Sequence, residues 1–301
     1  MPEPARGEVR VRVRATAVNR ADLLQRMGAY PAPKDSPPDI PGLEIAGEVD
    51  ALGPGATELA VGDRVFGLVG GGGYAEAIVS HERALAKIPP NLSFEEAAAV
   101  PEAFVTAYDA MVERGRLRGG ETLLISAAGS GVGTAAIQLG RALGATVVGT
   151  ARTQDKLDRC KALGMDVGVV PDAGGRFASR VPPPHVIVEL VGGAYLAEDL
   201  RCIQTLGRIV LVGLLAGAKT ELELGLLLHK RAQLVGTMLR ARPLEQKIAA
   251  MRAFEAEVVP LLARGAVKPI IDCVLPLADA PKAHERMASN EGFGKIVLTC
   301  G

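Results

Sequence analysis

From Glu121 onward, short apolar segments alternate with amphipathic segments of helical period. The helical segments include residues 132–143 and 154–163, and the apolar ones are TLLISAA, TVVGTA, VGVV, VIVELVG, RIVLVGLL and AQLVGTML. Strands this apolar are buried on both faces, as in parallel sheets that helices cover. The alternation predicts an α/β fold with a doubly wound parallel sheet, whose last strand is Ala232–Leu239.

The first hundred residues follow a different pattern, with short strands and many turns. Residues Glu8–Ala15 alternate apolar and charged side chains, and strands are also expected at Glu44–Ala51 and Arg64–Leu68. Ser93 and Glu96 form a capping-box pattern at the start of a helical run that reaches Gly115. A long helix is expected over residues 244–263, and IIDCVLPL and KIVLTC supply two final strands.

Composition excludes several classes of protein. The chain has 34 basic and 34 acidic side chains, so it has no field to hold a polyanion and is not expected to bind nucleic acid. No apolar run reaches the roughly 18 residues of a membrane span, and the charged N-terminus does not resemble a signal peptide. The four cysteines are scattered without disulfide spacing, which favours a reducing cytoplasm.

The segment from Ser126 to Gly133 follows an apolar strand and opens a helix. Gly131, Gly133 and Ala136 match the dinucleotide-binding fingerprint, in which glycines let the backbone approach a pyrophosphate at a helix N-terminus. Ser130 and Val132 belong to the same turn. The alternative is a glycine-rich turn that serves packing alone.

The second strand of the sheet indicates which dinucleotide is bound. NAD sites usually place Asp or Glu at its end, about 20 residues after the glycines. Here Arg152 and Thr153 stand at that end, with Lys156 one turn into the next helix. A guanidinium suits a phosphate dianion, so we expect NADPH rather than NADH, unless Arg152 and Lys156 are ordinary solvated charges.

The spacing of the histidines and the absence of two catalytic motifs argue against a metal site and against a serine nucleophile. The histidines at 81, 185, 229 and 284 are far apart, and there is neither an HExxH nor a GxSxG motif. Hydride transfer needs no such groups, because a nicotinamide supplies the reducing equivalent and the protein positions the reactants. No metal is therefore expected.

Several segments in order along the chain resemble the medium-chain dehydrogenase/reductase superfamily. The resemblance is to its zinc-free quinone oxidoreductase (zeta-crystallin-like) branch, and within it to the p53-inducible type. It covers nearly the whole chain and rests on VNRADLLQRMGAYP, PGLEIAGEV, VGDRVFGLVGGGGYAE, EEAAAVPEAFVTAYDA, SGVGTAAIQLGRALGA, DKLDRCKALG and FGKIVL.

The resemblance implies a Rossmann domain over residues 103–239, inserted in a GroES-like catalytic domain of residues 1–102 plus 240–301. Zinc-dependent relatives would have ligands where Asn19 and Leu43 stand and near Glu102, and Asn19 and Leu43 cannot supply that coordination. Relatives begin some 20–30 residues earlier, so either the start of the sequence is misassigned or the first hairpin is missing, and loss of the hairpin would leave a strand edge unpaired.

The resemblance also implies the site residues. Asn19, Asp22 and Tyr30 are expected to line the catalytic cleft, although Asp22 read alone fits a helix cap and Tyr30 a loop residue. The residues expected to bind the cofactor are Thr106, Ser130, Gly131, Val132, Gly133, Arg152, Thr153, Lys156, Gly213, Leu214 and Lys295.

These observations favour a zinc-independent, NADPH-dependent reductase of a quinone. Reduction of an enoyl or other α,β-unsaturated carbonyl compound uses the same hydride geometry and stays open, as does a non-catalytic NADPH-binding protein with a structural or RNA-associated role. The apolar, uncharged strand Ala232–Leu239 would be a sheet edge that pairs with its copy. We therefore expect a homodimer through this strand.

Overall fold

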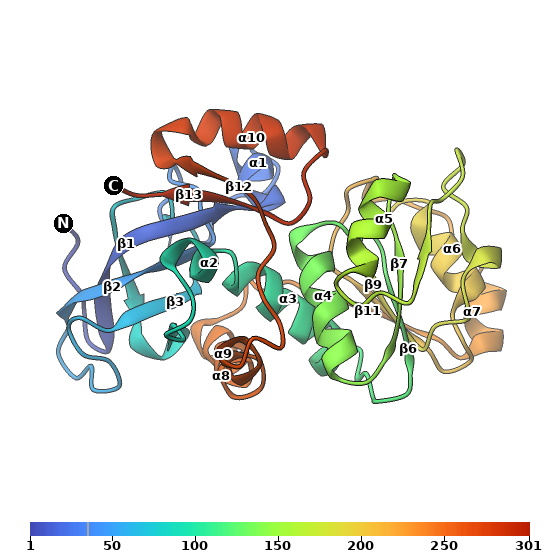
Figure 1. Cartoon of the computed structure of the whole chain (residues 1–301), viewed down its shortest axis with the longest axis horizontal. Helices are drawn as coiled ribbons and strands as arrows, with labels where there is room; N and C mark the ends of the chain where they lie inside the picture. The colour runs from blue at the N-terminus through green and yellow to red at the C-terminus, as the bar shows by residue number, and fades with distance from the viewer. Residues whose placement is uncertain (35) are drawn as a thin grey trace. The chain divides into compact units, whose positions relative to one another are not determined.

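The computed structural model describes residues 1–34 and 36–301 (Figure 1). The chain divides into two compact units, and the first of them is discontinuous in sequence. Unit 1 contains residues 1–105 and 239–301, and unit 2 contains residues 106–238. The described helices include none that is long and apolar enough to cross a membrane.

Unit 1 is built on a sheet whose strands run in the order β12-β13-β1-β2-β3-β5, with β4 paired to β1. Its pairs are antiparallel except for β12 and β13, which are parallel. The strands are β1 (Glu8–Val18), β2 (Glu44–Leu52), β3 (Arg64–Leu68), β4 (Ala77–His81), β5 (Leu85–Lys87), β12 (Ile271–Pro276) and β13 (Lys295–Thr299).

The alternation in β1 decides which of its faces is buried. Val9, Val11 and Val13 are inaccessible to solvent and pack with Ile45 of β2, while the intervening arginines are at least partly exposed. β1 pairs with β4 near its start and with β13 near its end, where Val18 lies opposite Ile296. The expected unpaired edge is therefore not found at β1.

Helices and single turns complete unit 1, most of them short. Asn19 caps α1, and Ser93 and Glu96 form the predicted capping box of α2. The helices are α1 (Arg20–Arg26), α2 (Phe94–Ala98), α8 (Leu244–Glu257), α9 (Val259–Ala263) and α10 (Ala280–Ser289), with the 3₁₀ turns η1 (Glu82–Ala84) and η5 (Leu277–Asp279) and the π-helical η2 (Pro101–Val105).

Unit 2 contains a parallel sheet in the order β11-β10-β9-β6-β7-β8, which confirms the predicted doubly wound fold. The direction of winding reverses between β6 and β9, and ligands of such sheets bind at this point. The strands are β6 (Thr122–Ile125), β7 (Thr146–Thr150), β8 (Val167–Val169), β9 (Val186–Glu189), β10 (Arg208–Leu211) and β11 (Gln233–Gly236).

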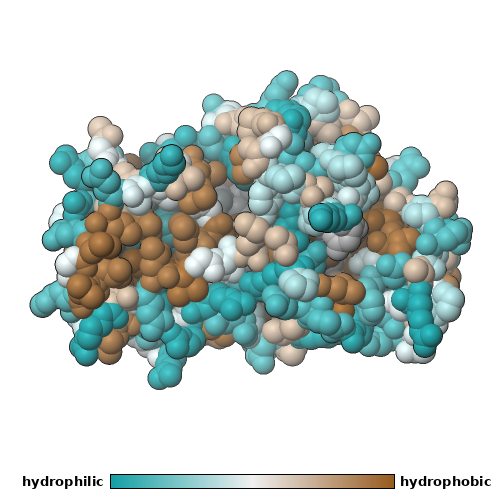
Figure 2. Space-filling view, turned by 180° about the vertical axis from the view of Figure 1, so that it is seen from behind, coloured by the Kyte–Doolittle hydropathy of each residue, from teal (hydrophilic) through white to brown (hydrophobic). Residues whose placement is uncertain are grey.

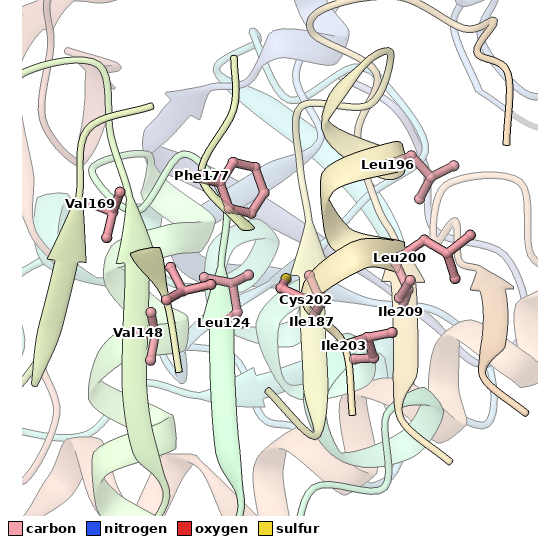
Figure 3. Packing of buried hydrophobic residues seen from close by; sticks show 11 residues of the cluster. Leu124, Val148, Val169, Phe177, Ile187, Leu196, Leu200, Cys202, Ile203 and Ile209 are labelled. Carbon is pink, nitrogen blue, oxygen red and sulfur yellow. The ribbon is translucent and has the colours of Figure 1, made fainter. Parts of the chain in front are cut away.

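The strands of unit 2 are connected through helices. The helices of unit 2 are α3 (Thr106–Tyr108), α4 (Gly131–Ala142), α5 (Gln154–Lys161), α6 (Tyr195–Cys202) and α7 (Leu224–Lys230), with the π-helical η3 (Asp109–Arg114) and the 3₁₀ turn η4 (Ala178–Arg180). On one face of the sheet, apolar residues of five neighbouring strands pack with those of α6 (Figure 3). The strand residues are Val169, Val148, Leu124, Ile187 and Ile209.

Three expected elements are shorter than the sequence pattern indicates. The run from Ser93 to Gly115 is not one α-helix, because π-helical turns interrupt it. The helix expected over 244–263 breaks at Val258, two residues before Pro260, whose ring cannot occupy a helix interior. The last strand of the sheet covers Gln233–Gly236 rather than Ala232–Leu239.

The edge strand β11 lies next to an exposed apolar surface. Leu234 is 41% exposed, and Leu224 and Leu228 of α7 are 65% and 76% exposed. Figure 2 shows a broad hydrophobic area on the side of the molecule that carries unit 2. Exposed apolar patches often mark surfaces that bind other molecules.

Candidate functional site

The turn between β6 and α4 is closely packed around Gly133. A Cβ atom at this position would lie 2.5 Å from the carbonyl oxygen of Ala128, so only glycine fits. Ser130 caps α4, because its Oγ accepts a hydrogen bond of 3.0 Å from the Gly133 N–H. The N–H groups of a first helical turn have no carbonyl one turn earlier and are available to an anion. This turn therefore fits the phosphate cradle predicted for Ser130, Gly131, Val132 and Gly133.

Basic side chains follow the end of β7. Arg152 is exposed just beyond Thr150, the last residue of the strand. Thr153 caps α5, and its Oγ1 accepts a hydrogen bond of 3.4 Å from the backbone of Lys156. The first acidic side chain after β7 is Asp155, which is exposed in the first turn of α5.

Gly213 and Leu214 follow β10. A Cβ atom on Gly213 would lie 2.5 Å from the carbonyl oxygen of Leu190, so this turn also requires glycine. Leu214 is 50% exposed. Because β6, β7 and β10 are parallel, the structure brings three predicted cofactor segments to the same edge of one sheet. Thr106 stands apart from them in sequence, at the start of α3, and is buried.

Unit 1 contains a buried ion pair. The Nζ atom of Lys295 lies 2.7 Å from Oε1 of Glu44, and both residues are shielded from solvent. The same ammonium donates to Oδ1 of Asn19 at 2.6 Å and to the carbonyl oxygen of Val18 at 3.1 Å. A buried charge is tolerated only when it is paired and hydrogen bonded in this way.

Glu44 connects three segments of unit 1. Its Oε1 also accepts a hydrogen bond of 2.8 Å from the Asn19 side chain, and its Oε2 accepts one of 2.8 Å from the backbone N–H of Glu102. The ion pair thus fixes the start of α1 and the π-helical segment η2 against the sheet.

Asp22 lies beside this cluster and is fully buried. Its carboxylate accepts hydrogen bonds from the backbones of Asn19 and Gly42, at 2.7 Å and 3.1 Å. It also accepts one of 3.1 Å from the hydroxyl of Tyr74, whose oxygen lies 3.1 Å from Nε2 of His284. A hydroxyl carries one hydrogen, so a Tyr74 that donates to Asp22 accepts from His284, which sets the histidine tautomer.

Burial alters the acidity of these three groups. It raises the pKa of Asp22, although hydrogen bonds from Asn19 and Gly42 oppose the rise. It raises the pKa of Tyr74 well above its ordinary value, with a further contribution from Asp22. Burial lowers the pKa of His284, so this imidazole is neutral at physiological pH.

Arg240 holds the loop that contains Tyr30. Its guanidinium donates to the carbonyl oxygens of Gly70 and Tyr30 at 2.7 Å and 3.2 Å, and to Oε1 of Gln25 at 2.5 Å. The guanidinium carbon lies 5.0 Å from the centre of the Tyr30 ring, within the range of a cation–π interaction. Burial is the main cause that raises the pKa of Tyr30, which is therefore un-ionised.

A small recess of about 20 Å³ lies beside Arg240 within unit 1. Glu102 is the acidic residue of its wall, and burial together with the negative charge of Glu44 raises the pKa of this carboxyl to about 8. The remaining lining residues are Leu43, Leu68, Val69, Leu239, Lys247 and Ala250.

The structure brings Asn19, Asp22 and Lys295 together in one cluster and places Tyr30 against Arg240. Lys295 is engaged with Glu44 in unit 1, and its predicted contact with the cofactor stays a prediction. Sequence reasoning missed Glu44, Tyr74, His284 and Arg240 as members of the site. The sequence did contain a sign that Glu44 and Lys295 belong to the site, because each is a charged residue at the start of an apolar strand.

The residues at the positions of zinc ligands in zinc-dependent relatives are Asn19, Leu43 and Glu102. Among the residues that the structure describes, no group of three or more His, Cys, Asp or Glu side chains could hold a metal ion.

Comparison with known proteins identifies both parts of the chain. Residues 5–90 match the alcohol dehydrogenase GroES-like domain, and residues 131–256 match the zinc-binding dehydrogenase family. The quinone oxidoreductase of Pseudomonas aeruginosa is 34% identical over an alignment of 307 positions, which covers 98% of this chain and 92% of that protein. The chain belongs to the medium-chain dehydrogenase/reductase (MDR) superfamily.

Two further relatives of this MDR protein differ in kind. The quinone oxidoreductase of Thermus thermophilus, whose structure was also solved in complex with NADPH, superposes with a TM-score of 0.85 at 33% identity and covers 99% of this chain and 93% of its own. The polyketide synthase GfsB of Streptomyces halstedii is 36% identical over 97% of this chain. The MDR chain spans only 5% of the length of that synthase.

Proposed function

We propose that this MDR protein transfers a hydride from NADPH to a quinone without the help of zinc. The observation that carries the proposal is the end of β7, where Arg152, Thr153 and Lys156 stand in place of the acidic residue typical of NAD sites. Its similarity to quinone oxidoreductases supports a quinone as the acceptor.

The residues of unit 2 divide the task of holding the cofactor. The α4 N-terminus, with Ser130 and Gly133, would bind the pyrophosphate, and Arg152 would bind the 2′-phosphate with charge-assisted hydrogen bonds. Gly213 and Leu214 would lie beneath the nicotinamide, and Thr106 near it. When bound, NADPH supplies the hydride, so the protein contributes position, desolvation and proton transfer.

The proposal is tested by fluorescence titration of NADPH and NADH. Wild type is expected to bind NADPH more tightly, and Arg152→Ala to weaken this binding by about 1–3 kcal/mol, the usual cost of a lost hydrogen bond to a charged group. Arg159→Ala, an exposed cation of α5, serves as the matched control and should leave affinity unchanged. Equal affinity for both cofactors would contradict the NADPH assignment.

Reduction of an activated alkene is the second candidate. It uses the same hydride geometry as reduction of a quinone, and the similarity of this chain to polyketide synthases, as well as to quinone oxidoreductases, keeps it as an alternative. A panel of quinones and enoyl thioesters, with NADPH oxidation followed by its absorbance, separates the two. Turnover of enoyl thioesters alone would replace the quinone, while tight NADPH binding without turnover of any acceptor would favour a non-catalytic binding protein.

The partner of the edge strand is proposed to be a second copy of this chain. Among the described residues β11 is the last strand of its sheet, and this edge, with the exposed apolar side chains of Leu224, Leu228 and Leu234 nearby, fits its own symmetry mate. A cytoplasmic location stays a prediction from the spacing of the cysteines.

A further inference from the structure

Two carboxyl groups are buried in unit 2 with most of their oxygen atoms unpartnered. Glu189 is the last residue of β9 and Asp199 lies in α6, and both residues are inaccessible to solvent. Over residues 1–34 and 36–301, no hydrogen-bond donor reaches Oε2 of Glu189 or either carboxyl oxygen of Asp199. A buried carboxylate without partners is costly, so these atoms require an explanation.

A proton shared by the two carboxyl groups satisfies them. The groups are within hydrogen-bonding range of each other, and two carboxylates in contact cannot both be ionised in a site without water. Burial, together with the negative charge of Glu189, raises the pKa of Asp199 well above its ordinary value. A protonated Asp199 can therefore donate to Oε2 of Glu189, which gives each side chain a partner.

The neighbouring ionisable groups do not replace this proton. Glu198 is paired with Arg201, and its negative charge raises the pKa of Asp199 further. The other groups are Tyr195 and Cys202 of α6, and Arg152, whose charge acts on Tyr195. The pair of Glu189 and Asp199 thus has one proton and one negative charge at neutral pH.

Glu189 organises the loop after β9, residues 190–194. Its Oε1 accepts hydrogen bonds of 2.5 Å and 2.6 Å from the backbone N–H groups of Val191 and Gly192. Gly192 and Gly193 have φ angles of +70° and +54°, in the left-handed region that favours glycine. The backbone turns tightly around the carboxylate, so the direction of the Glu189 side chain fixes the loop.

The loop after β9 is bonded in turn to the loop after β10, residues 212–217. The Ala216 N–H donates to the carbonyl oxygen of Val191 at 2.7 Å. A Cβ atom on Gly192 would lie 3.0 Å from Cδ2 of Leu214, so the two loops are in close contact. The position of Leu214 therefore depends on the loop that Glu189 holds.

We propose that Glu189 and Asp199 share one proton and position these two loops for the nicotinamide, an inference that rests on the function proposed above. Glu189 holds the first loop through two N–H groups, and Asp199 holds the side chain of Glu189. The second loop contains Gly213 and Leu214, which are proposed to lie beneath the ring. Both carboxyl groups are positioning residues, because they are buried and act through the backbone.

The first experiment titrates each variant with NADPH and with 2′,5′-ADP, which has the 2′-phosphate but no nicotinamide. Asp199→Leu has a similar volume but no hydrogen bond. It should weaken NADPH binding by about 10-fold or more, the usual cost of a buried group left without its partner. It should leave the affinity for 2′,5′-ADP unchanged. Asp199→Asn can still donate to Glu189 and should retain most of the NADPH affinity.

The matched control is Asp166→Leu. The Asp166 carboxylate accepts a hydrogen bond of 2.7 Å from the Val147 N–H near the start of β7, at the opposite edge of the parallel sheet. This variant should leave both affinities unchanged. Asp199→Leu should also lower kcat by about 100-fold, since a displacement of about 1 Å at a reacting ring can cost that much.

A second variant leaves the buried pair intact. Ala216→Pro removes the N–H that bonds the second loop to Val191, and Ala216 is exposed, so the variant is expected to fold. It should weaken the binding of NADPH and leave that of 2′,5′-ADP unchanged, as Asp199→Leu does.

The shared proton is tested separately by infrared spectroscopy at neutral pH. The difference spectrum between wild type and Asp199→Asn should contain a carboxylic acid band, because the variant has only the ionised Glu189 at this place. Without this band the proposal is wrong, whatever the affinities.

The outcomes distinguish the positioning role from the proposed function. If Asp199→Leu and Ala216→Pro bind NADPH as tightly as wild type, the positioning role is overturned and the proposed function stays intact. An equal loss of both ligands in Asp199→Leu would also overturn it, because general destabilisation would then be responsible. A wild type that binds neither ligand would overturn the proposed function and the positioning role together.

Discussion

Lys295 and Glu44 are charged residues buried in unit 1, and the contribution of each to stability depends on the presence of the other. The ammonium and the carboxylate lie 2.7 Å apart at the starts of β13 and β2, the two neighbours of β1, and Asn19 binds both of them. Removing one partner of such a pair leaves the other charged and unsolvated, which costs more than the intact pair contributes.

We predict that Lys295→Met lowers the free energy of unfolding by about 3–5 kcal/mol, because Glu44 is left without its cation. The double variant Glu44→Gln/Lys295→Met should recover most of this loss. Arg14→Met removes a cation from a half-exposed pair with Glu48 and should cost less than about 1 kcal/mol. Urea unfolding measures all three, and equal losses in the two single variants would contradict a special role of burial.

Individual residues of the site could be predicted only where a local pattern reported them. Asn19 and Asp22 stand in a capping box, and the segment that carries Arg152 has a known place after a strand. Glu44 meets Lys295 only because β1 pairs with both β2 and β13. This contact spans about 250 residues of sequence, and no local pattern contains it.

At the scale of elements, α2 and α4 both begin with a serine cap, but only the N-terminus of α4 is proposed to bind a phosphate. Ser93 and Ser130 each accept a hydrogen bond from the N–H three residues later. The turn before α4 also contains Ala127 in a left-handed conformation, and the first turn of α4 contains the closely packed Gly133. These features let its backbone approach a phosphate, and the capping box of α2 has no such turn.

We predict that Ser93→Ala and Ser130→Ala each lower the free energy of unfolding by about 1 kcal/mol, the usual cost of a lost helix cap. Only Ser130→Ala should also weaken NADPH binding, because its cap orders the turn that would hold the pyrophosphate. Thermal unfolding with and without NADPH tests the pair. A similar loss of affinity in Ser93→Ala would show that general destabilisation is responsible.

The strands of unit 2 were predictable because each is a short apolar run between turns, and a parallel sheet buries such runs on both faces. The structure of the helical run after Ser93 was harder to predict from the sequence. Its apolar spacing is compatible with α-helical and π-helical turns alike, and the backbone hydrogen bonds that distinguish them leave little trace in sequence. The break near Val258 had a local signal in Pro260.

For the whole molecule, the exposed apolar surface at β11 and α7 is the feature from which we expect a dimer rather than a monomer. We predict that light scattering after size-exclusion chromatography gives twice the chain mass of 31.3 kDa. Leu234→Lys should produce monomers, because it places a charge on the exposed face of the edge strand.

Val61→Lys, at an exposed apolar position in unit 1, is the control for this experiment and should leave the mass unchanged. A wild-type mass of 31.3 kDa would contradict the proposed dimer.

The discontinuity of unit 1 sets the order in which the protein can be assembled on the ribosome. Unit 2 is a single stretch of sequence, residues 106–238, so it can fold as soon as it leaves the exit tunnel. The end of β1, residues 15–18, must wait for β13, which is translated after all of unit 2. Throughout that interval the nascent chain carries Glu44 without Lys295, and this end of β1 is open on one edge to chaperones and to neighbouring chains, while its first part can already pair with β4.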